Sequence, residues 1–174
     1  GSIVKSDDIT GPEGTLVKRL KSLGCIVLGK THTVEFALGA TGLNKNKGTP
    51  KNPWDNKMHR FPGGSSSGSA VAVASGLAAF AIGTDTGGSV RIPASLTGIA
   101  GLKTTKGVWP TDGIFPLSPT LDTPGPLARS IEDIKYIFEA YDCNKILSEK
   151  EVNLKGLKLA KLGAPFTNEL DKEV

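Results

Sequence analysis

The segment from residue 63 to residue 89 constrains the fold of this chain most, because small residues fill almost all of it. It reads GGSSSGSAVAVASGLAAFAIGTDTGGS, and Asp85 is its one charged side chain. The wider region 61–130 holds only four basic and three acidic residues. A stretch so poor in charge is buried or lines a site, and small side chains allow close packing of backbones. We therefore expect residues 61–130 to be largely buried or to line a site.

Periodicity and turn residues predict short helices and strands along the chain. Helices are expected over residues 12–23, 32–38, 66–76, 90–94 and 130–141. Buried strands are expected over residues 25–28, 79–84, 99–103 and 157–162. Residues 39–62 and 107–129 are interpreted as irregular, because Pro and Gly are frequent in both. Alternating strands and helices predict a layered α/β fold.

Composition limits the class of protein. Apolar residues make up 38% of the 174 positions, which is too many for a disordered chain despite 22 Gly and 11 Pro. No apolar run reaches the length of a membrane span, and the start of the sequence has no signal-peptide pattern. Cys25 and Cys143 lie far apart without metal-site spacing. We expect a soluble, cytoplasmic protein with reduced thiols.

The net charge of +4 comes with a basic loop. Its cationic residues are Lys45, Lys47, Lys51, Lys57 and Arg60. A solvated loop is the favoured interpretation, since no aromatic residues are interleaved to stack on bases. Nucleic-acid binding is the less favoured alternative.

The first Gly/Ser cluster, GGSSSGS at 63–69, has two simple interpretations besides a catalytic one. A flexible linker is disfavoured because the cluster runs directly into an apolar helix. A phosphate-binding loop is disfavoured because neither Gly-Lys-Ser/Thr nor the GxGxxG spacing is present. The cluster is therefore better explained as part of a reactive site.

The second cluster, Asp85 to Ser89, fits a nucleophile on a tight turn. Gly87 and Gly88 permit a left-handed backbone and close approach of a substrate. Ser89 would stand at a helix start, where free N–H groups favour negative charge. The amides of Thr86, Gly87, Gly88 and Ser89 could together bind an oxyanion.

A serine nucleophile needs a base. The sequence holds two histidines, His32 and His59, and either could complete a triad with Asp85. The sequence does not show that either lies near Ser89, and an isolated histidine is more often structural or solvent-facing. A histidine base is the less favoured alternative.

Both clusters together resemble the amidase signature family of Ser-Ser-Lys hydrolases. The resemblance rests on Gly63–Ser69, on Gly83-Thr84-Asp85-Thr86-Gly87-Gly88-Ser89-Val90-Arg91-Ile92-Pro93 and on Gly101-Leu102-Lys103. It extends to Val27-Leu28-Gly29-Lys30-Thr31, Asn52-Pro53-Trp54-Asp55 and Leu121-Asp122-Thr123-Pro124-Gly125-Pro126-Leu127, and so covers nearly the whole chain. The separation of 24 positions between Ser65 and Ser89 makes it specific.

The resemblance implies a fold and a role for each matching residue. The fold is the core of the amidase signature architecture, a mixed β-sheet flanked by helices. Ser89 matches the nucleophile, and Ser65 matches a serine on a cis peptide that relays a proton to a lysine. Ser66 matches a serine that positions this lysine. Thr86, Gly87 and Gly88 match the oxyanion hole, with Asp85 and Arg91 as supporting residues. No metal or organic cofactor is implied.

The resemblance also implies that two parts of the domain are absent. The family's lysine precedes the segment that Gly1-Ser2 matches, and no lysine here, Lys5 and Lys30 included, occupies its motif. The family's C-terminal half is absent too. We expect residues 1–174 to be the central part of a single amidase domain that is incomplete and inactive alone.

Three functional hypotheses follow. The favoured one is an amidase acting on a small-molecule amide together with the rest of its chain, with homodimerisation left open. Within the family, residues 116–123 resemble free-standing amidases more than the A-type component of the glutaminyl-tRNA amidotransferase, which is the enzymatic alternative. The third hypothesis is a non-catalytic module that binds a partner through an exposed sheet edge.

Overall fold

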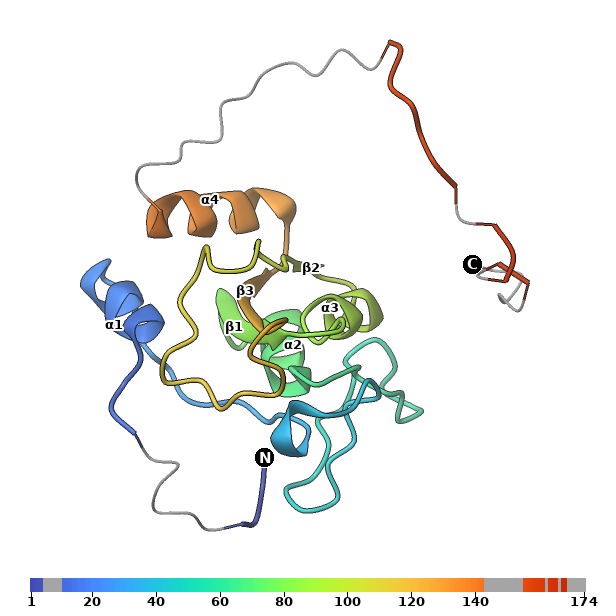
Figure 1. Cartoon of the computed structure of the whole chain (residues 1–174). Coiled ribbons are helices and arrows are strands. Elements are labelled where there is room, and N and C mark those ends of the chain that lie inside the picture. The colour runs from blue at the N-terminus through green and yellow to red at the C-terminus, as the bar shows by residue number, and fades with distance from the viewer. Residues whose placement is uncertain (5–10, 143–154, 162, 166, 169–174) are drawn as a thin grey trace.

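The structure is a computed structural model that describes residues 1–4, 11–142, 155–161, 163–165 and 167–168. Figure 1 shows helices gathered around a small sheet. The elements in chain order are α1 (Thr15–Ser22), a 3₁₀ helix η2 (Glu35–Ala37), α2 (Ser67–Ala74), β1 (Phe80–Asp85), α3 (Arg91–Thr97), β2 (Ala100–Gly101), β3 (Thr123–Ala128) and α4 (Ile131–Tyr141).

The described strands form a three-stranded sheet in the order β1-β3-β2. β3 pairs antiparallel with β1 from Phe80↔Ala128 to Asp85↔Thr123, and antiparallel with β2 at Ala100↔Ala128. The α/β class is thus confirmed. The described strand pairs are all antiparallel, however, whereas a mixed sheet was expected.

The prediction that residues 107–129 are irregular is wrong at β3, whose six residues are all buried. Pro124 and Pro126 lie opposite Thr84 and Ile82. In an antiparallel pair, alternate residues point their polar groups away from the partner strand. Both prolines take these outward positions, and no β2 residue pairs opposite either of them. A strand with two prolines therefore sits inside the sheet, because neither position has to donate to β1.

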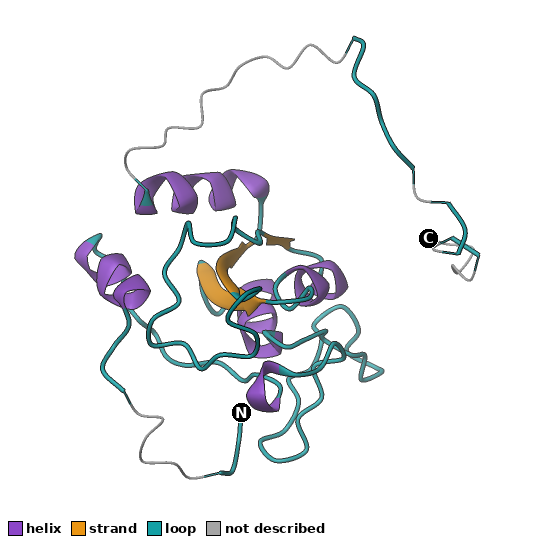
Figure 2. Cartoon of the chain, viewed as in Figure 1, coloured by secondary structure: helices purple, strands orange, loops and turns teal. Residues whose placement is uncertain are grey.

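Helices cover both faces of the sheet (Figure 2). Leu127 packs with Ala70, Val90 and Ala94, from α2 and the region of α3. Ala128, its neighbour in β3, belongs to a second core on the opposite face. That core also contains Leu16, Leu20, Trp109, Ile134 and Ile137. The segment 63–89 contributes α2 and β1 to these layers, and its residues 63–70 are all buried.

The predicted helices form with different bounds: α1 and α2 are shorter than expected, residues 32–38 form only the 3₁₀ helix η2, and α3 extends beyond the expected 90–94 to Thr97. Ser130 caps α4 as expected, because its hydroxyl accepts a hydrogen bond from Asp133 N at 3.0 Å. α1 begins after Gly14, which has no side chain to cap it. Asp112 Oδ2 accepts instead from Thr15 N and Thr15 Oγ1, both at 2.8 Å. These bonds lower the pKa of Asp112 and join α1 to the loop before β3.

Two predicted strands are wrong in the described residues. Residues 25–28 are extended without strand pairing, and Ile26 and Leu28 are 84% and 74% exposed. Residues 157–161 also lack a strand, and residue 162 lies outside the described part. Apolar sequence alone suggested both strands, but strand pairing needs a neighbour that these residues do not meet here. Cys25 is a free thiol, and Cys143 lies outside the described residues.

The helices among the described residues include none that is long and apolar enough to span a membrane. The cationic side chains of the basic loop are all exposed, as expected for a solvated loop. Arg60 pairs there with Asp55 at 3.0 Å.

Candidate active site

The fold brings the two serine segments into contact. Ser66 N donates to Ser89 O at 3.2 Å, although 23 positions separate these residues. A Cβ on Gly63 would lie 2.7 Å from Pro93 Cα, so the start of the first segment packs directly on the start of α3. The Gly64–Ser65 peptide bond is cis, in agreement with the bond that the resemblance implies. The two clusters are therefore in contact through their backbones, and the meeting of the Ser65 and Ser89 hydroxyls stays a prediction.

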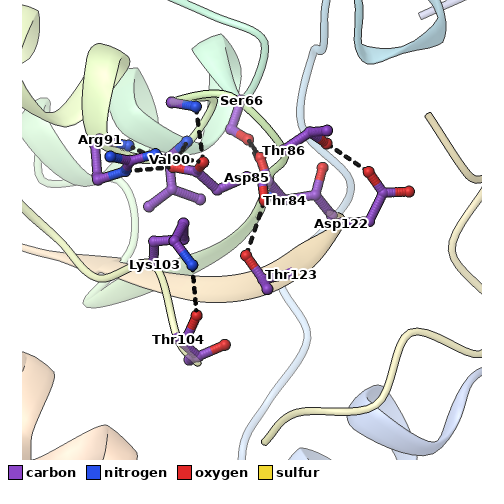
Figure 3. Close-up of polar contacts among 11 residues, drawn as sticks. Ser66, Thr84, Asp85, Thr86, Val90, Arg91, Lys103, Thr104, Asp122 and Thr123 are labelled. Carbon is purple, nitrogen blue, oxygen red and sulfur yellow. Dashed lines mark hydrogen bonds and ion pairs between the residues drawn. The ribbon is translucent and has the colours of Figure 1, made fainter. Parts of the chain in front are cut away.

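Asp85 organises the turn between β1 and α3 (Figure 3). Its carboxylate is fully buried and accepts from Gly88 N at 2.7 Å and from Val90 N at 3.1 Å. Arg91 donates from its backbone N, from Nε at 3.1 Å and from Nη2 at 3.0 Å. Thr123 Oγ1 donates to the Asp85 carbonyl at 2.8 Å, which fixes the end of β1 to the start of β3. Asp85 and Arg91 thus hold the shape of the turn, and their role in supporting a reaction stays a prediction.

Opposing effects determine the pKa of Asp85. Burial disfavours the charged carboxylate and raises the pKa, whereas the hydrogen bonds from Arg91 and from the Val90, Gly88 and Arg91 amides lower it. The hydrogen bonds prevail, so the pKa lies below its usual value. The pKa of Arg91 is raised by its hydrogen bond to Asp85. The turn is thus held by a charged pair at neutral pH.

The two glycines of the turn have different surroundings. Gly88 has φ of 123°, and a Cβ there would lie 2.7 Å from Ile92 Cδ1. A Cβ on Gly87 would meet nothing within 4 Å, so the backbone at Gly87 borders open space. The Gly88 N–H is occupied by Asp85, which corrects the expectation that it serves as an oxyanion donor. Thr86, Gly87 and Ser89 remain as candidate donors in the turn.

Asp122 holds the first residue of the turn, a role that its sequence context did not indicate. Thr86 Oγ1 donates to Asp122 Oδ1 at 2.5 Å (Figure 3). Leu117 N donates to Asp122 Oδ2, and Ser118 N to both carboxylate oxygens, each at 3.0 Å. Its position just before the Thr-Pro-Gly-Pro run marked it only as part of a motif. The contact is between residues 36 positions apart, which local sequence does not reveal.

Ser66 and Ser69 bind the outer edge of β1. Thr84 N donates to Ser66 Oγ at 3.2 Å, and Ser66 Oγ lies 3.3 Å from the Thr84 carbonyl, to which it donates. Ser69 Oγ donates to Ile82 O at 2.8 Å. Gly83 is needed between them, because a Cβ there would lie 2.6 Å from Ser66 Oγ. In the described residues Ser66 thus joins α2 to β1, whereas the resemblance assigns it to positioning a lysine.

A cavity of about 200 Å³ lies at this edge and reaches Ser65. Its lining includes the hydroxyl-bearing residues Thr31, Ser65, Ser66, Ser69 and Thr84. The other lining residues come from the start of α1, from the 112–114 segment, from β1 and from residues 33 and 37. No lysine is among the described residues that line the cavity. A larger cavity of about 560 Å³ near Trp54 and Leu96 shares no lining residue with either serine cluster. The smaller cavity is thus lined by the first serine cluster, whereas Ser89 is not among its lining residues.

No contact among the described residues supports a histidine as the base for Ser89. His32 and His59 are both exposed, and the hydrogen bonds of the described residues join neither imidazole to Ser89. The link from His32 to the serine segment is its carbonyl, which accepts from Gly68 N at 2.9 Å. Asp85, the acid of such a triad, is bound to Arg91 instead. In the described part of the chain, no cluster of three His, Cys, Asp or Glu residues is arranged for a metal ion.

Comparison with known proteins agrees with this geometry. A family model described as amidase matches residues 1–166. The chain is 49% identical to 2-amino-5-chloromuconic acid deaminase of Comamonas testosteroni over 163 residues, which are 92% of this chain and 35% of that protein. It is 48% identical over 127 residues to the A-type component of the glutamyl-tRNA(Gln) amidotransferase of Symbiobacterium thermophilum, with 73% of this chain and 26% of the relative covered.

Solved structures give the same result. A crystal structure of an amidase matches with a TM-score of 0.71 and 44% identity over 74% of this chain and 29% of that one. The native peptide amidase of Stenotrophomonas maltophilia matches with a TM-score of 0.67 and 45% identity, over 72% of this chain and 26% of its own. The chain thus spans about a quarter to a third of the length of these relatives, and it shares their fold over the matched part.

Proposed function

This chain belongs to the amidase family, and from that premise we propose that its protein hydrolyses the carbon–nitrogen bond of an amide through a serine acyl-enzyme. Ser89 is the nucleophile, Ser65 relays protons, and a lysine from outside this chain is the base. The contact between the two serine segments, from Ser66 N to Ser89 O, is the observation that carries the proposal.

The proposed reaction has two steps. Ser89 Oγ attacks the amide carbonyl, its proton passes through Ser65 to the neutral lysine, and the carbonyl oxygen becomes an oxyanion. The carbon–nitrogen bond then breaks, the proton returns to the leaving nitrogen, and an acyl ester remains on Ser89. Water then attacks this ester and passes a proton through Ser65 to the lysine, and that proton returns through Ser65 to Ser89 Oγ as the carbon–oxygen bond breaks and the acid leaves. Each oxyanion donor in such a site contributes about 2.7–4 kcal/mol to lowering the barrier.

The surroundings of the turn support this assignment of roles. The candidate donors at Thr86, Gly87 and Ser89 lie where Gly87 borders open space, so a substrate can approach the backbone closely. Gly88 shapes the turn, and its N–H is held by Asp85. Asp85 and Arg91 are supporting residues that keep the turn folded.

We propose that the lysine enters the hydroxyl-lined cavity beside Ser65. A lysine must be largely desolvated to be neutral near pH 7, and a cavity between α1 and the edge of β1 offers that environment. Ser66, whose hydroxyl lies at this cavity, would contact the amine as the resemblance implies, in addition to its bonds with Thr84.

Residues 1–174 are accordingly proposed to be the central part of a single amidase domain. The relatives are about three to four times longer than the matched part, and the missing lysine predicts that this polypeptide alone has no amidase activity. Mixing it with a polypeptide that carries the remaining segments should restore turnover. Full activity of residues 1–174 alone would contradict this proposal.

A second candidate is the A-type component of a tRNA-dependent amidotransferase, because a relative of that name is 48% identical. Both this relative and the deaminase have names that describe chemistry at nitrogen, so identity alone does not separate them. Glutaminase activity together with co-purifying partner proteins would favour the amidotransferase. Hydrolysis of small amides by the isolated full-length protein would favour a free-standing amidase.

The proposed setting is the cytoplasm, where the free thiol of Cys25 would remain reduced. A homodimer is the proposed assembly, and the mass of the full-length protein in solution tests it. The proposal assigns no role to nucleic acid, a metal ion or an organic cofactor.

A fluorophosphonate probe tests the proposal directly, because it reacts with an activated serine and stays attached. We expect the full-length protein to be labelled on Ser89 and the Ser89→Ala variant not to be labelled. Ser75→Ala, which changes an exposed serine at the end of α2, is the matched control and should label normally. A folded full-length protein that does not label would instead support the non-catalytic binding module.

A further inference from the structure

We propose that Asp122 is a positioning residue that acts through the side chain of Thr86. It orients the proposed oxyanion donors of the turn between β1 and α3 (residues 86–90), which carries Ser89. The inference rests on the proposed function, because it assigns the turn its role in binding the oxyanion. Asp122 is not among the site residues expected from the sequence, and it would act through its hydrogen bond with the Thr86 hydroxyl.

The contact between Asp122 and Thr86 is short and shielded. The hydroxyl of Thr86 donates to Asp122 Oδ1 at 2.5 Å, and Asp122 is 7% exposed. A hydrogen bond from a hydroxyl to a carboxylate is stronger than one between neutral groups. Both side chains are drawn facing each other in Figure 3. This bond restricts the side chain of the residue whose N–H stands at the start of the turn.

The sheet holds Asp122 in place. Thr123 follows it at the start of β3 and pairs with Asp85 at the end of β1. Thr123 Oγ1 donates to the Asp85 carbonyl at 2.8 Å. Asp122 is the loop residue directly before β3, and Thr86 directly follows β1. The pairing of Thr123 with Asp85 therefore brings the Asp122 carboxylate, at the end of its loop, next to the start of the turn.

The turn is attached on both sides of Gly87, and on the α3 side the Ser89 carbonyl also accepts from Ser66 N. Asp85 binds the amides of Gly88, Val90 and Arg91, which lie on the α3 side of the turn. On the β1 side, the side-chain bond of Thr86 to Asp122 is the attachment. Gly87 is exposed, and a side chain there would meet nothing within 4 Å. Loss of the Asp122 bond would therefore free the peptide groups of Thr86 and Gly87 to rotate.

Asp122 also has a structural task. It accepts from the amides of Leu117 and Ser118, and its own carbonyl accepts from Lys106 Nζ at 3.1 Å. Lys106 Nζ donates to the Pro119 carbonyl as well. A variant of Asp122 will thus disturb the 117–122 loop in addition to the turn. The test must separate these two effects.

The test measures fluorophosphonate labelling of Ser89 in the full-length protein, resolved into an apparent affinity and a maximal rate. The variants are Asp122→Asn, Thr86→Val, Thr86→Ser and the double variant Asp122→Asn/Thr86→Val. Thr86→Val removes the bond but leaves in place the groups by which Asp122 binds the Leu117 and Ser118 amides, and Thr86→Ser retains the hydroxyl. Urea unfolding of each variant reports the stability separately.

We expect Thr86→Val and Asp122→Asn each to lower the maximal labelling rate by about 10- to 100-fold with little change in apparent affinity, because misplaced donors act on the transition state. Thr86→Ser should label within about threefold of the parent, as expected when the hydroxyl is retained. Adding Asp122→Asn to Thr86→Val should cost much less than it does in the parent, since both changes act on the same bond: Asp122→Asn replaces its charged acceptor by a neutral amide, and Thr86→Val removes its donor.

Asp55→Asn is the matched control. Asp55 also accepts from two backbone amides of its own loop, Lys57 N at 2.9 Å and Met58 N at 3.0 Å, but it does not contact the turn. Its labelling should be unchanged. Three results would overturn the positioning role while Ser89 in the parent remains labelled. They are additive losses of labelling rate in the double variant, equal losses in Thr86→Ser and Thr86→Val, and normal labelling of Asp122→Asn. An unlabelled parent protein would overturn the proposed function and this inference together.

Discussion

The Arg91 guanidinium binds both carboxylate oxygens of Asp85, with Nε 3.1 Å from Oδ2 and Nη2 3.0 Å from Oδ1. Asp85 is fully buried, whereas about half of the Arg91 side chain is exposed. The paired geometry matches the planar guanidinium and cannot be reproduced by a lysine. This ion pair joins the last residue of β1 to the first residue of α3.

Arg91→Lys is expected to lower the free energy of unfolding, because one of the two side-chain bonds to a buried carboxylate is lost. A hydrogen bond to a charged group contributes about 1.5–3 kcal/mol, and the exposure of Arg91 favours the lower end. Urea unfolding followed by circular dichroism measures the loss. Arg60→Lys, which changes the exposed pair with Asp55, should leave the midpoint almost unchanged. Equal losses in both variants would contradict the special role of the buried pair.

The lowered pKa of Asp85 predicts how stability depends on pH. Its folded-state pKa lies below the unfolded value near 3.9, so folding favours the ionised form. This contribution is complete above the unfolded pKa and is lost as the pH falls through the folded pKa. The contribution of Asp85 to the free energy of unfolding should therefore be constant near neutral pH and should decrease below about pH 4. In Arg91→Gln the pKa of Asp85 is less depressed, so the acid-induced decrease should be smaller than in the parent.

The tight turn between β1 and α3 was predictable from sequence, whereas the long-range hydrogen bonds that hold it were not. Gly87, Gly88 and Ser89 follow an apolar strand and precede a helix, a local pattern that indicates a tight turn. The bond from Thr86 to Asp122 spans 36 positions and depends on the pairing of β1 with β3. β3 itself was missed because two prolines are normally evidence against a central strand.

Local sequence also failed to show which polar atoms already have a hydrogen-bond partner within the fold. The Gly88 amide was expected among the oxyanion donors, but the Asp85 carboxylate accepts from it. Apolar residues 25–28 looked like a buried strand, yet Ile26 and Leu28 are largely exposed in the described structure. Both errors have the same cause: hydrogen-bond partners and strand neighbours are set by tertiary contacts, not by residue type.

Gly88 and Gly87 should respond differently to a single methyl group. Gly88→Ala places a Cβ 2.7 Å from Ile92 Cδ1 at φ of 123°, a conformation that costs a non-glycine residue about 1–3 kcal/mol. Gly87→Ala adds a methyl group to open space without a left-handed φ, so its unfolding midpoint should stay near that of the parent. Thermal unfolding of the two variants gives the comparison. A larger loss in Gly87→Ala than in Gly88→Ala would show that the turn has a different shape.

Ser66 and Ser67 form the sharpest matched pair in the chain, because adjacent buried serines have opposite hydrogen-bonding. Ser66 Oγ bonds with the N–H and carbonyl of Thr84, whereas Ser67 Oγ is buried without a partner. Ser66→Ala leaves the Thr84 N–H unsatisfied and should destabilise the protein by about 1–2 kcal/mol.

Ser67→Ala removes a hydroxyl that contributes no bond, in the first turn of α2, where alanine is the better helix former. Removing a buried group that lacks a partner should leave stability unchanged or raise it by up to about 1 kcal/mol. Urea unfolding of the two variants at neutral pH measures the difference. If both substitutions had the same effect, the edge of β1 would not depend on the Ser66 hydroxyl, and α2 would be held to the sheet by apolar packing alone.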